Sequence, residues 1–405
     1  MTKYGRSPWL DDFPASRVPS HPRHRAAASN ADAVVVGGGL TGCLTAYALA
    51  AAGVKVILLE AERLGRGATA YASGWIAEDP GVPFDHVEKL IGLRKARRAW
   101  LAWRRAALDF TALIRRLDIK CYLEERGTVT VASTPEQIAR LKKDQKARAD
   151  AGVDATSLNA RAIKADLAVD AAAGVRAKAG GTLDPYRACV GIAGAAADRG
   201  TQIFENSPVR RIRFTRKTID VYTSAGPIRT RRVVIATGLP GDLFSALARH
   251  FWFHSAFLVL TDPVPAKIRH QLGGRQAVLR DSAEPRHVVS WRDERVLVEG
   301  ADSEMLPPRA RDKILPQRTG QLMYELSTLY PDISGIQAAY GWSTDYARTE
   351  DGLPYIGVHR NYPFHLFAFG DSSHSLTGSY LASRILLRHY SGEMDPADEA
   401  FGFHR

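Results

Sequence analysis

The sequence predicts an α/β fold (α+β, interleaved), in which a parallel nucleotide-type sheet is interleaved along the chain with mixed and antiparallel β structure. First, residues 32–62, "DAVVVGGGLTGCLTAYALAAAGVKVILLEAE", have the pattern of a strand, a glycine turn, a helix and a second strand. Second, "RRVVIATG" (231–238) and "PFHLFAFGD" (363–371) are apolar runs typical of buried strands in the same sheet. Third, the region from about 250 to 330 alternates as antiparallel strands do and ends in an expected helix at 317–330.

Residues 32–62 divide into three expected elements. Residues 33–36 form an expected buried strand, residues 41–52 are mostly good helix formers, and "VKVILLE" is an expected second strand ending at Glu60. Such a βαβ unit is right-handed and lies inside a parallel sheet, as in Rossmann-like domains. A membrane span is excluded, because four glycines, the break at Gly53 and the β-branched ends interrupt any continuous apolar helix.

The pattern Gly37-x-Gly39-x-x-Gly42 has a physical role in holding a pyrophosphate. The first glycine makes the tight turn, the second lets the backbone approach the phosphates, and the third lets helix and strand pack closely. The helix N-terminus then presents N–H groups and positive potential to the anion. Glu60 follows the second strand, where a carboxylate accepts hydrogen bonds from ribose hydroxyls and repels the 2′-phosphate of NADP. Together these features predict a dinucleotide site, with a purely structural glycine turn as the open alternative.

Composition places the chain among ordinary globular proteins, with 45% hydrophobic and 24% charged residues in a length of 405. Its net charge of +12 fits a general arginine-rich bias, because no basic tract is dense enough to bind nucleic acid. Three widely spaced cysteines, Cys43, Cys121 and Cys189, form no metal-ligand pattern and suit a reducing compartment. We therefore expect a cytoplasmic protein with no metal, no nucleic-acid partner and no membrane span. The oligomeric state stays open.

The chain is expected to begin with an N-terminal arm. Residues 1–30 are rich in proline and arginine and lack the apolar core of a signal peptide. We expect this arm to lie extended on the surface, and disorder is the open alternative. The expected domain boundaries are 31–105, 170–245 and 335–392 for a discontinuous cofactor-binding domain, 106–169 and 246–334 for a substrate domain, and 393–405 for a C-terminal tail.

Two further helices follow from periodicity and capping signals. Residues 94–117 are expected to be helical, with the basic residues on a solvated face. Its apolar positions recur at helical spacing: Trp100, Trp103, Leu108, Leu113 and Leu117. Residues 134–152 predict a second helix, in which Thr134 is the N-cap and Gln137 completes a capping box.

The stretch after Glu60 distinguishes a flavin from a nicotinamide dinucleotide. "RLGRGATAYASGW" (63–75) is rich in glycine and small residues, where an NAD dehydrogenase usually continues with a helix. A flavin needs a long backbone path past its pyrophosphate and ribityl chain, and Thr69 and Ser73 suit such a path. The stretch resembles the "RxGxGAS…GG" segment of the D-amino-acid oxidase-like (DAO) family of FAD-dependent amine oxidoreductases.

The resemblance returns near the C-terminus. "GWSTDYARTEDGLPYIG" (341–357) is similar to a loop and strand of that family, and "LFAFGDSSHSLTGSYLASRILLRHYSG" (366–392) is similar to its closing motif. The residues of the closing motif most resemble those of the γ-glutamylputrescine oxidoreductase-like and sarcosine oxidase-like branches. The resemblance is specific at 33–75 and 341–392 and weak between them. It implies an FAD cofactor, a mixed or antiparallel substrate domain and oxidation of C–N bonds in amines or amino acids.

The closing motif also has a physical reading of its own. A buried strand ends before Gly370 and Asp371, and a polar loop then precedes a helix expected over about 379–389. Thr377 and Ser379 are natural N-cap residues. The N-terminus of this helix would offer N–H groups to the N1–C2=O edge of the flavin and stabilise its anionic reduced form. Asp371 would hold ribityl hydroxyls, and a capped surface helix is the open alternative.

These interpretations give one set of expected cofactor residues, drawn from the glycine loop, the stretch after it, two further strand ends and the closing motif. They are Gly37, Gly38, Gly39, Leu40, Thr41, Gly42, Glu60, Ala61, Gly67, Ala68, Thr69, Ser73, Gly74, Val209, Thr237, Gly238, Gly370, Asp371, Thr377, Gly378 and Ser379. Covalent attachment of FAD is not expected. Cys43 lies inside the first helix, no cysteine lies in the C-terminal third, and no histidine lies between residues 61 and 77.

The expected catalytic and substrate-contacting residues are Trp291, Arg292 and His374. Trp291 and Arg292 lie on a strand of the middle region, where the family often presents an aromatic-x-Arg pattern over the flavin, and Arg292 would pair with a carboxylate. The resemblance places His374 in a loop beside the flavin ring, where it would handle protons. A surface arginine and a loop-fixing histidine are the open alternatives. Trp342 and Tyr346 are expected either to line the pocket or to belong to the core.

The resemblance implies that a hydride passes from the carbon bearing the nitrogen to flavin N5 and that the imine is then hydrolysed. No general base is required if the amine binds unprotonated, which agrees with the lack of an obvious acid–base pair. Sarcosine oxidases have a lysine in the closing motif where this sequence has Thr377, so we expect oxygen to be a poor electron acceptor. Two other functions stay open: an FAD-dependent 2-hydroxy-acid dehydrogenase and a non-catalytic flavoprotein paralogue. The sequence does not identify the amine.

Overall fold

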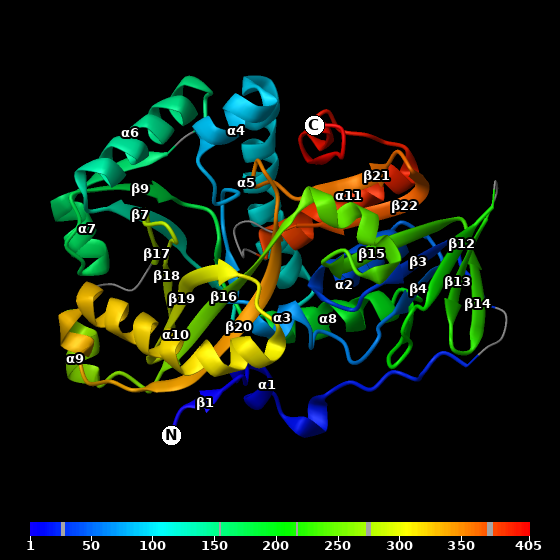
Figure 1. Cartoon of the computed structure of the whole chain (residues 1–405), viewed down its shortest axis with the longest axis horizontal. Helices are drawn as coiled ribbons and strands as arrows, with labels where there is room; N and C mark the ends of the chain where they lie inside the picture. The colour runs from blue at the N-terminus through cyan, green and yellow to red at the C-terminus, as the bar shows by residue number, and fades with distance from the viewer. Residues whose placement is uncertain (26–28, 154, 216–217, 273–276, 371–375) are drawn as a thin grey trace.

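The computed structural model describes residues 1–25, 29–153, 155–215, 218–272, 277–370 and 376–405. Two β units lie side by side in Figure 1, a mostly parallel sheet with its helices on the right and a larger mixed sheet on the left. The N-terminal arm runs beneath both of them. Because each unit takes strands from separate stretches of the chain, the expected interleaved α/β architecture is confirmed.

The parallel unit is centred on a sheet to which the described residues contribute six strands. In sheet order they are β11 (Gln202–Phe204), β4 (Val56–Leu59), β3 (Ala33–Val36), β15 (Arg232–Gly238), β22 (Tyr362–Phe369) and β21 (Tyr355–His359). β3 pairs in parallel with β4 and β15, and β15 pairs in parallel with β22. All residues of β3 and β4 are buried, as expected for parallel strands covered on both faces.

Helices and a small sheet cover the two faces of this sheet. One face packs against α2 (Leu40–Ala51), α8 (Pro185–Ala197), α11 (Thr377–Ser391) and, beyond them, α5 (Leu93–Arg116). The other face packs against η2 (Asp242–His250) and a sheet of β12 (Arg211–Phe214), β13 (Ile219–Thr223), β14 (Gly226–Thr230) and β2 (Ser29–Asn30). The strand–glycine turn–helix–strand pattern expected from residue 33 to Glu60 is therefore present as β3, α2 and β4.

The larger unit is a mixed sheet to which the described residues contribute nine strands. In sheet order they are β1 (Lys3–Tyr4), β20 (Ala338–Arg348), β16 (Trp252–Thr261), β19 (Arg295–Glu304), β18 (Val288–Arg292), β17 (Ala277–Asp281), β7 (Gly127–Ala132), β9 (Ala173–Ala177) and β8 (Thr156–Asn159). The strands from β16 to β19 pair antiparallel, as expected for this region. β20 lies in this sheet, although it falls within the segment 335–392 that the sequence assigns to the cofactor domain.

The remaining elements join or cover the two units. Helices α7 (Ala160–Leu167) and α10 (Pro308–Leu329) bury apolar residues on the outer face of the large sheet. A short sheet of β5 (Trp75–Ile76), β10 (Gly181–Thr182) and β6 (Glu124–Glu125) lies between the units. The other elements are α1 (Pro8–Asp11), η1 (Ala15–Arg17), α3 (Ala68–Tyr71), α4 (Phe84–Ile91), α6 (Pro135–Asp150), α9 (Ala266–Gln271), η3 (Pro331–Ile333) and η4 (Asp398–Phe401).

Several local expectations can be compared with this structure. The capping box of Thr134 and Gln137 at the start of α6 is confirmed. The helix expected at 317–330 instead begins at Pro308, because proline is tolerated in the first helical turn, and it continues through Pro316. Leu108, expected on the apolar face of α5, is 47% exposed, because the helix packs only along its opposite side. Within the described residues, no helix is both long enough and apolar enough to cross a membrane.

Candidate active site

The glycine loop between β3 and α2 is built by close backbone contacts. Gly37 has a φ of +106°, and a Cβ at this position would lie 2.5 Å from the carbonyl oxygen of Ala236 on β15. A Cβ at Gly42 would lie only 1.9 Å from the carbonyl oxygen of Gly37. Both positions therefore require glycine for the fold itself, since a side chain would push the helix away from the strands.

Gly39 differs from these two glycines. It has extended backbone dihedral angles, and the one atom near a Cβ built there is Thr69 Oγ1, at 3.2 Å. The folded chain therefore nearly accommodates an alanine at this position. The absence of a side chain at Gly39 leaves the start of α2 accessible to the phosphates of a ligand that comes close to the backbone.

Glu60 is fixed next to this loop. The backbone N–H of Gly38 donates to Glu60 Oε2 at 2.6 Å, and the N–H of Glu62 donates to Oε1 at 2.8 Å. Each carboxylate oxygen has a further lone pair, so Glu60 can still accept ribose hydroxyls at the end of β4. The glycine loop, the α2 N-terminus and Glu60 thus fit the adenosine and pyrophosphate half of a dinucleotide.

The N-termini of α2 and α11 meet at this loop. Leu40 N–H donates to Thr69 Oγ1 at 2.9 Å, and Thr41 Oγ1 donates to Ser379 Oγ at 2.8 Å. Two oriented helix N-termini lie together here, which creates a positive potential for an anionic or reduced group. Thr69 therefore accepts a hydrogen bond from a backbone N–H in the first turn of α2. Ser379 links the start of α11 to the same turn.

The expected N-caps of α11 are wrong in detail. The N-cap residue is Leu376, which makes no side-chain capping hydrogen bond. Thr377 is the first helical residue, and its hydroxyl donates to the carbonyl oxygen of Ala77 at 2.8 Å. Leu376 N–H donates to the carbonyl oxygen of Trp75 at 2.8 Å. The start of α11 is thus tied to β5 instead of being capped by its own side chains.

The expected flavin stretch, residues 63–75, follows a bent path that contains the single-turn helix α3. Gly74 has a φ of +81°, and a Cβ there would lie 2.1 Å from the carbonyl oxygen of Leu183, so only glycine fits against β10. Gly67 is the N-cap of α3, and Ala68 is its first residue. Ser73 is 4% exposed, and its hydroxyl has no hydrogen-bond partner among the described residues. An unpartnered buried hydroxyl of this kind is suited to a bound ligand.

The other expected cofactor residues lie on several different elements of the fold. Gly238 and Phe369 pair across β15 and β22, so Gly238 and Gly370 lie at the same edge of the sheet as Gly37 and Glu60. The hydroxyl of Thr237 donates to the carbonyl oxygen of Leu239. Of three others, Ala61 follows Glu60 and is exposed, half-buried Val209 packs against the apolar cluster behind the sheet, and Gly378 faces Trp103 of α5. Asp371 and His374 lie outside the described residues.

A small cavity of about 40 Å³, partly open to solvent, lies where the stretch around Ser73 meets the large sheet. We name it the seam cavity. Its lining includes Trp9, Ser73, Asp184, Ser290 and Arg292. It therefore joins the N-terminal arm, the expected flavin stretch, the N-cap of α8 and strand β18.

The two expected residues on β18 point in different directions. Trp291 is 5% exposed and packs in the apolar cluster on the outer face of the large sheet. Ser290 and Arg292 alternate with it along the strand and line the seam cavity, and Trp291 also contributes to the lining. Trp291 therefore packs in the core and borders the cavity as well, as Arg292 does. Trp342, fully buried with its Nε1 donating to Tyr71 O, is also core.

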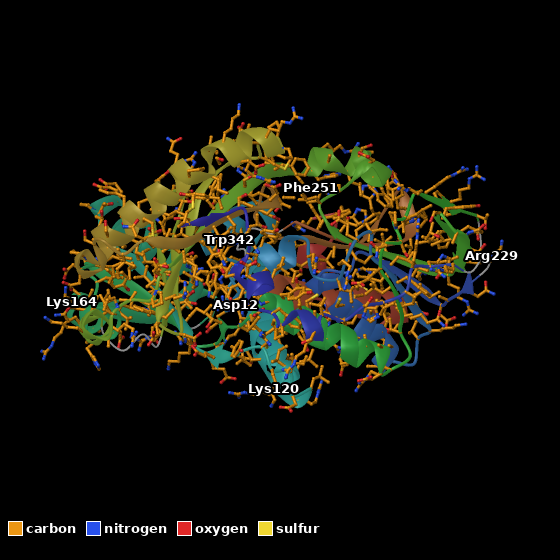
Figure 2. All side chains as sticks on the ribbon, turned by 90° about the horizontal axis from the view of Figure 1, so that it is seen from below. Asp12, Lys120, Lys164, Arg229, Phe251 and Trp342 are labelled. Carbon is orange, nitrogen blue, oxygen red and sulfur yellow. The ribbon has the colours of Figure 1, made fainter. Side chains whose placement is uncertain are left out.

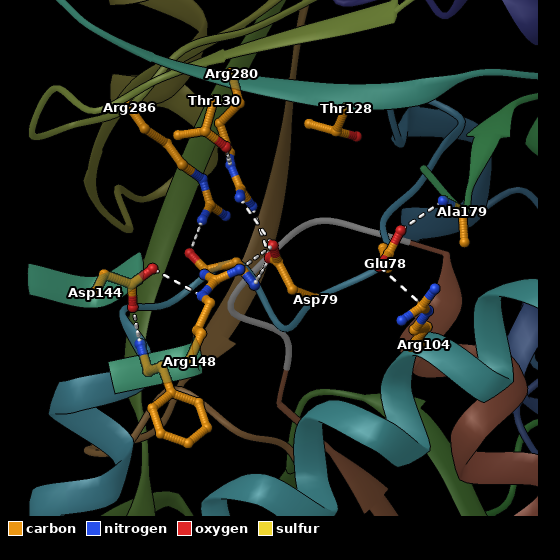
Figure 3. Close-up of polar contacts among 12 residues, drawn as sticks. Glu78, Asp79, Arg104, Thr128, Thr130, Asp144, Arg148, Ala179, Arg280 and Arg286 are labelled. Carbon is orange, nitrogen blue, oxygen red and sulfur yellow. Dashed lines mark hydrogen bonds and ion pairs between the residues drawn. The ribbon is translucent and has the colours of Figure 1, made fainter. Parts of the chain in front are cut away.

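A buried ionic cluster, which the sequence analysis missed, fixes the chain just after β5. Figure 3 shows Asp79 facing two arginines. Asp79 is 4% exposed and accepts from Arg280 Nη1 at 2.8 Å and Nη2 at 2.9 Å, and from Arg148 Nη1 at 3.2 Å. Asp144 pairs with Arg148 Nε at 2.8 Å and accepts the N–H of Phe84. Burial alone would raise the pKa of Asp79, but Arg280 and Arg148 outweigh it and hold that pKa well below its usual range.

Glu78 lies beside this cluster with a different electrostatic balance. It accepts the N–H of Ala179 and pairs with Arg104 Nε at 3.4 Å (Figure 3). Burial raises the pKa of Glu78, and the hydrogen bond and Arg104 only partly oppose this. Asp79 and Glu78 are neighbours in the chain, yet their pKa values shift in opposite directions. Asp79 has two buried arginine partners, whereas Glu78 has one arginine partner, which lies farther away. No pattern in "AEDP" signals either role, since the arginines come from other elements.

Comparisons with known proteins agree with this geometry. The family model described as "FAD dependent oxidoreductase" (DAO) matches residues 32–388. The chain is 25% identical to gamma-glutamylputrescine oxidoreductase of Escherichia coli strain K12, over 91% of this chain and 85% of that protein. It is also 25% identical to a glycine oxidase of Bacillus licheniformis, over 88% and 93% of the two chains. The crystal structure of L-proline dehydrogenase from P. horikoshii superimposes with a TM-score of 0.76 at 18% identity, covering 93% and 97% of the chains.

Proposed function

Because the chain belongs to the DAO family of FAD-dependent oxidoreductases, we propose that it oxidises a carbon–nitrogen bond of a small amine or amino acid. FAD, when bound, accepts the hydride of the carbon that bears the nitrogen, and water then hydrolyses the imine. The observation that supports this most directly is the seam cavity, which borders the expected flavin stretch at Ser73. The relatives at 25% identity include one named for a glutamylated amine and one named for an amino acid.

The residues of this chain divide between holding the cofactor and placing the substrate. Gly39, the α2 N-terminus and Glu60 would hold the adenosine and pyrophosphate half, as their geometry at the sheet edge supports. The α11 N-terminus, anchored to β5 by Thr377, would supply N–H groups and positive potential to the reactive half. Ser73 and Arg292 would orient the substrate from the walls of the seam cavity. We retain His374 and Asp371 as proposed contacts.

Anaerobic mixing of the purified yellow protein with a panel of amines and amino acids is expected to bleach the flavin absorbance near 450 nm. The physical reason is that the C–H bond beside the nitrogen gives up a hydride, whose two electrons reduce the bound flavin while the C–N bond becomes C=N. 2-Hydroxy acids serve as the contrasting panel, since they give up the hydride of a C–H bond beside a hydroxyl and form C=O. Bleaching by hydroxy acids alone would move the function to the 2-hydroxy-acid class, and no bleaching by any compound would favour a non-catalytic flavoprotein.

We also expect FAD to be held without a covalent bond. Cys43, Cys121 and Cys189 are all buried and unbridged, and Cys43 and Cys189 lie with Sγ atoms 3.7 Å apart beneath the glycine loop. Burial and the contact with Cys189 raise the pKa of Cys43, so little nucleophilic thiolate forms. Precipitation with trichloroacetic acid should therefore release yellow flavin into the supernatant. A yellow pellet would contradict this. The unbridged cysteines also support our proposal of a cytoplasmic location.

A further inference from the structure

The N-terminal arm closes one side of the seam cavity. The hydroxyl of Ser7 donates to the carbonyl oxygen of Ala70, and Trp9 Nε1 donates to that of Ala72 at 2.9 Å, so the arm is fastened to the expected flavin stretch. Phe13 packs edge-on against Tyr186 with ring centroids 5.1 Å apart. Figure 2 shows Asp12 at the junction of the two β units. Residues 7–13 are thus packed against the folded chain, and Trp9 of this wall segment lines the cavity.

Two residues of this wall hold Arg292. The guanidinium of Arg292 lies 4.2 Å from the centre of the Trp9 ring, and its Nη2 donates to Asp12 Oδ2 at 2.9 Å. The Arg292 side chain is 18% exposed and the Asp12 side chain 53% exposed, so solvent partly screens the ion pair. Arg292 Nη1 is buried and has no hydrogen-bond partner in the described part of the chain. Asp12 therefore occupies one edge of the Arg292 guanidinium, which still faces the cavity.

The other polar groups of the lining are suited to a cation. Three carboxyl residues, Glu124, Asp184 and Asp293, line the cavity together with Arg292. Asp184 is 1% exposed, and its Oδ2 makes no hydrogen bond within the described residues, although Arg187 Nε lies 3.4 Å away. The buried, unpartnered hydroxyl of Ser73 is also available. These acceptors match the N–H groups of an ammonium, whereas the one cation of the lining is already paired.

We propose that residues 7–13 set the substrate preference of the seam cavity, because Asp12 occupies Arg292 and thereby favours amines without a neighbouring carboxylate over α-amino acids. This rests on the proposed oxidation of a C–N bond and names the class of substrate. Only Nη1 of Arg292 is unpartnered, so the carboxylate of an α-amino acid would have to displace Asp12 from Nη2 before it could pair with both nitrogens. A simple amine needs no such exchange and finds acceptors in Asp184 and Ser73.

The test compares pentylamine with norleucine, which carry the same carbon chain on the carbon that bears the nitrogen. The wild-type holoenzyme, mixed anaerobically in a stopped-flow instrument, is expected to be reduced at least tenfold more efficiently by pentylamine. Asp12→Asn should raise the efficiency with norleucine at least tenfold and change that with pentylamine less than threefold. Asp12→Glu, which keeps the charge, should retain the wild-type preference.

Asp11→Asn is the matched control. Asp11 is the last residue of α1 and precedes Asp12, but its carboxylate pairs with Lys3 at 3.1 Å and Arg6 at 2.7 Å and has neither a hydrogen bond nor an ion pair with Arg292. This variant should leave the preference unchanged. A similar shift in the Asp11 and Asp12 variants would mean that the arm had merely loosened, and that would overturn the proposal. So would a wild-type preference for norleucine.

A binding measurement separates this inference from the proposed function. Pentanoate and pentylamine are titrated into each holoenzyme, and the perturbation of the flavin spectrum is recorded. We expect pentanoate to bind at least tenfold more tightly to Asp12→Asn than to the wild type, and this gain should vanish in Asp12→Asn combined with Arg292→Met. If no compound reduces the flavin, the proposed function fails, while this titration still decides whether Asp12 screens Arg292.

Discussion

Gly39→Ala is expected to give a folded protein that has lost most of its affinity for FAD. The one close atom would be Thr69 Oγ1 at 3.2 Å, a tight contact that a shift of the Thr69 side chain by a few tenths of an ångström relieves. The phosphates approach the backbone at this position, so the methyl group would overlap the cofactor and weaken its binding by at least about tenfold. The measurement is the ratio of absorbance at 450 nm to that at 280 nm in purified protein, together with the far-ultraviolet circular dichroism spectrum.

Two further glycine variants make this result interpretable. Gly320→Ala is the matched control, because no atom lies within 4 Å of a Cβ there and the residue is exposed on α10. It should keep both fold and flavin. Gly42→Ala should fail to fold, since its Cβ would lie 1.9 Å from the carbonyl oxygen of Gly37. A yellow Gly39→Ala protein would show that the phosphates do not pass this position.

Asp79→Ala is expected to destabilise the fold by about 3–5 kcal/mol, the usual cost of removing one partner of a buried ion pair. The substitution would leave Arg280 and Arg148 buried with an uncompensated positive charge. Urea unfolding followed by circular dichroism measures the change in free energy. The control is Asp150→Ala, which removes an exposed i,i+4 pair with Lys146 and should cost less than about 1 kcal/mol.

The pH dependence of this difference has a defined sign. The pKa of Asp79 is lower in the folded protein than in the unfolded chain, where it is about 3.9. The ionised carboxylate therefore stabilises the fold fully above that unfolded pKa, and the stabilisation is lost as the pH falls through the folded pKa. The gap between wild type and Asp79→Ala should stay constant from about pH 5 to 8 and shrink in acid below about pH 4. A gap that grows in acid would contradict the assignment.

The glycine loop and Glu60 could be predicted from the sequence, because the residues that form this part of the site lie close together in the chain. Gly37, Gly39 and Gly42 lie within one turn and helix, and β3, α2 and β4 follow from short periodic patterns. Glu60 ends the same unit, and its contact with Gly38 spans only 22 residues. Where a motif contains all of its own partners, residue spacing is sufficient to place it.

The rest of the site depends on partners far away in sequence. Asp79 meets Arg148 at a separation of 69 residues and Arg280 at a separation of 201, and Asp12 meets Arg292 at a separation of 280. Periodicity carries no information on such pairs. Thr377 shows the same limit, because a local signal marks it as an N-cap while its hydroxyl finds the carbonyl oxygen of Ala77, 300 residues away.

The parallel sheet also determines when this protein can finish folding during its synthesis. β15 pairs on one side with β3, which is made early, and on the other side with β22, which is made near the C-terminus. A nascent chain that has produced β15 therefore holds an open strand edge for on the order of ten seconds at ordinary elongation rates. The edge residues Val233 to Ile235 are strongly apolar, so they can pair with other chains during that interval. Slow translation between residues 238 and 362 would lengthen the exposure of this edge.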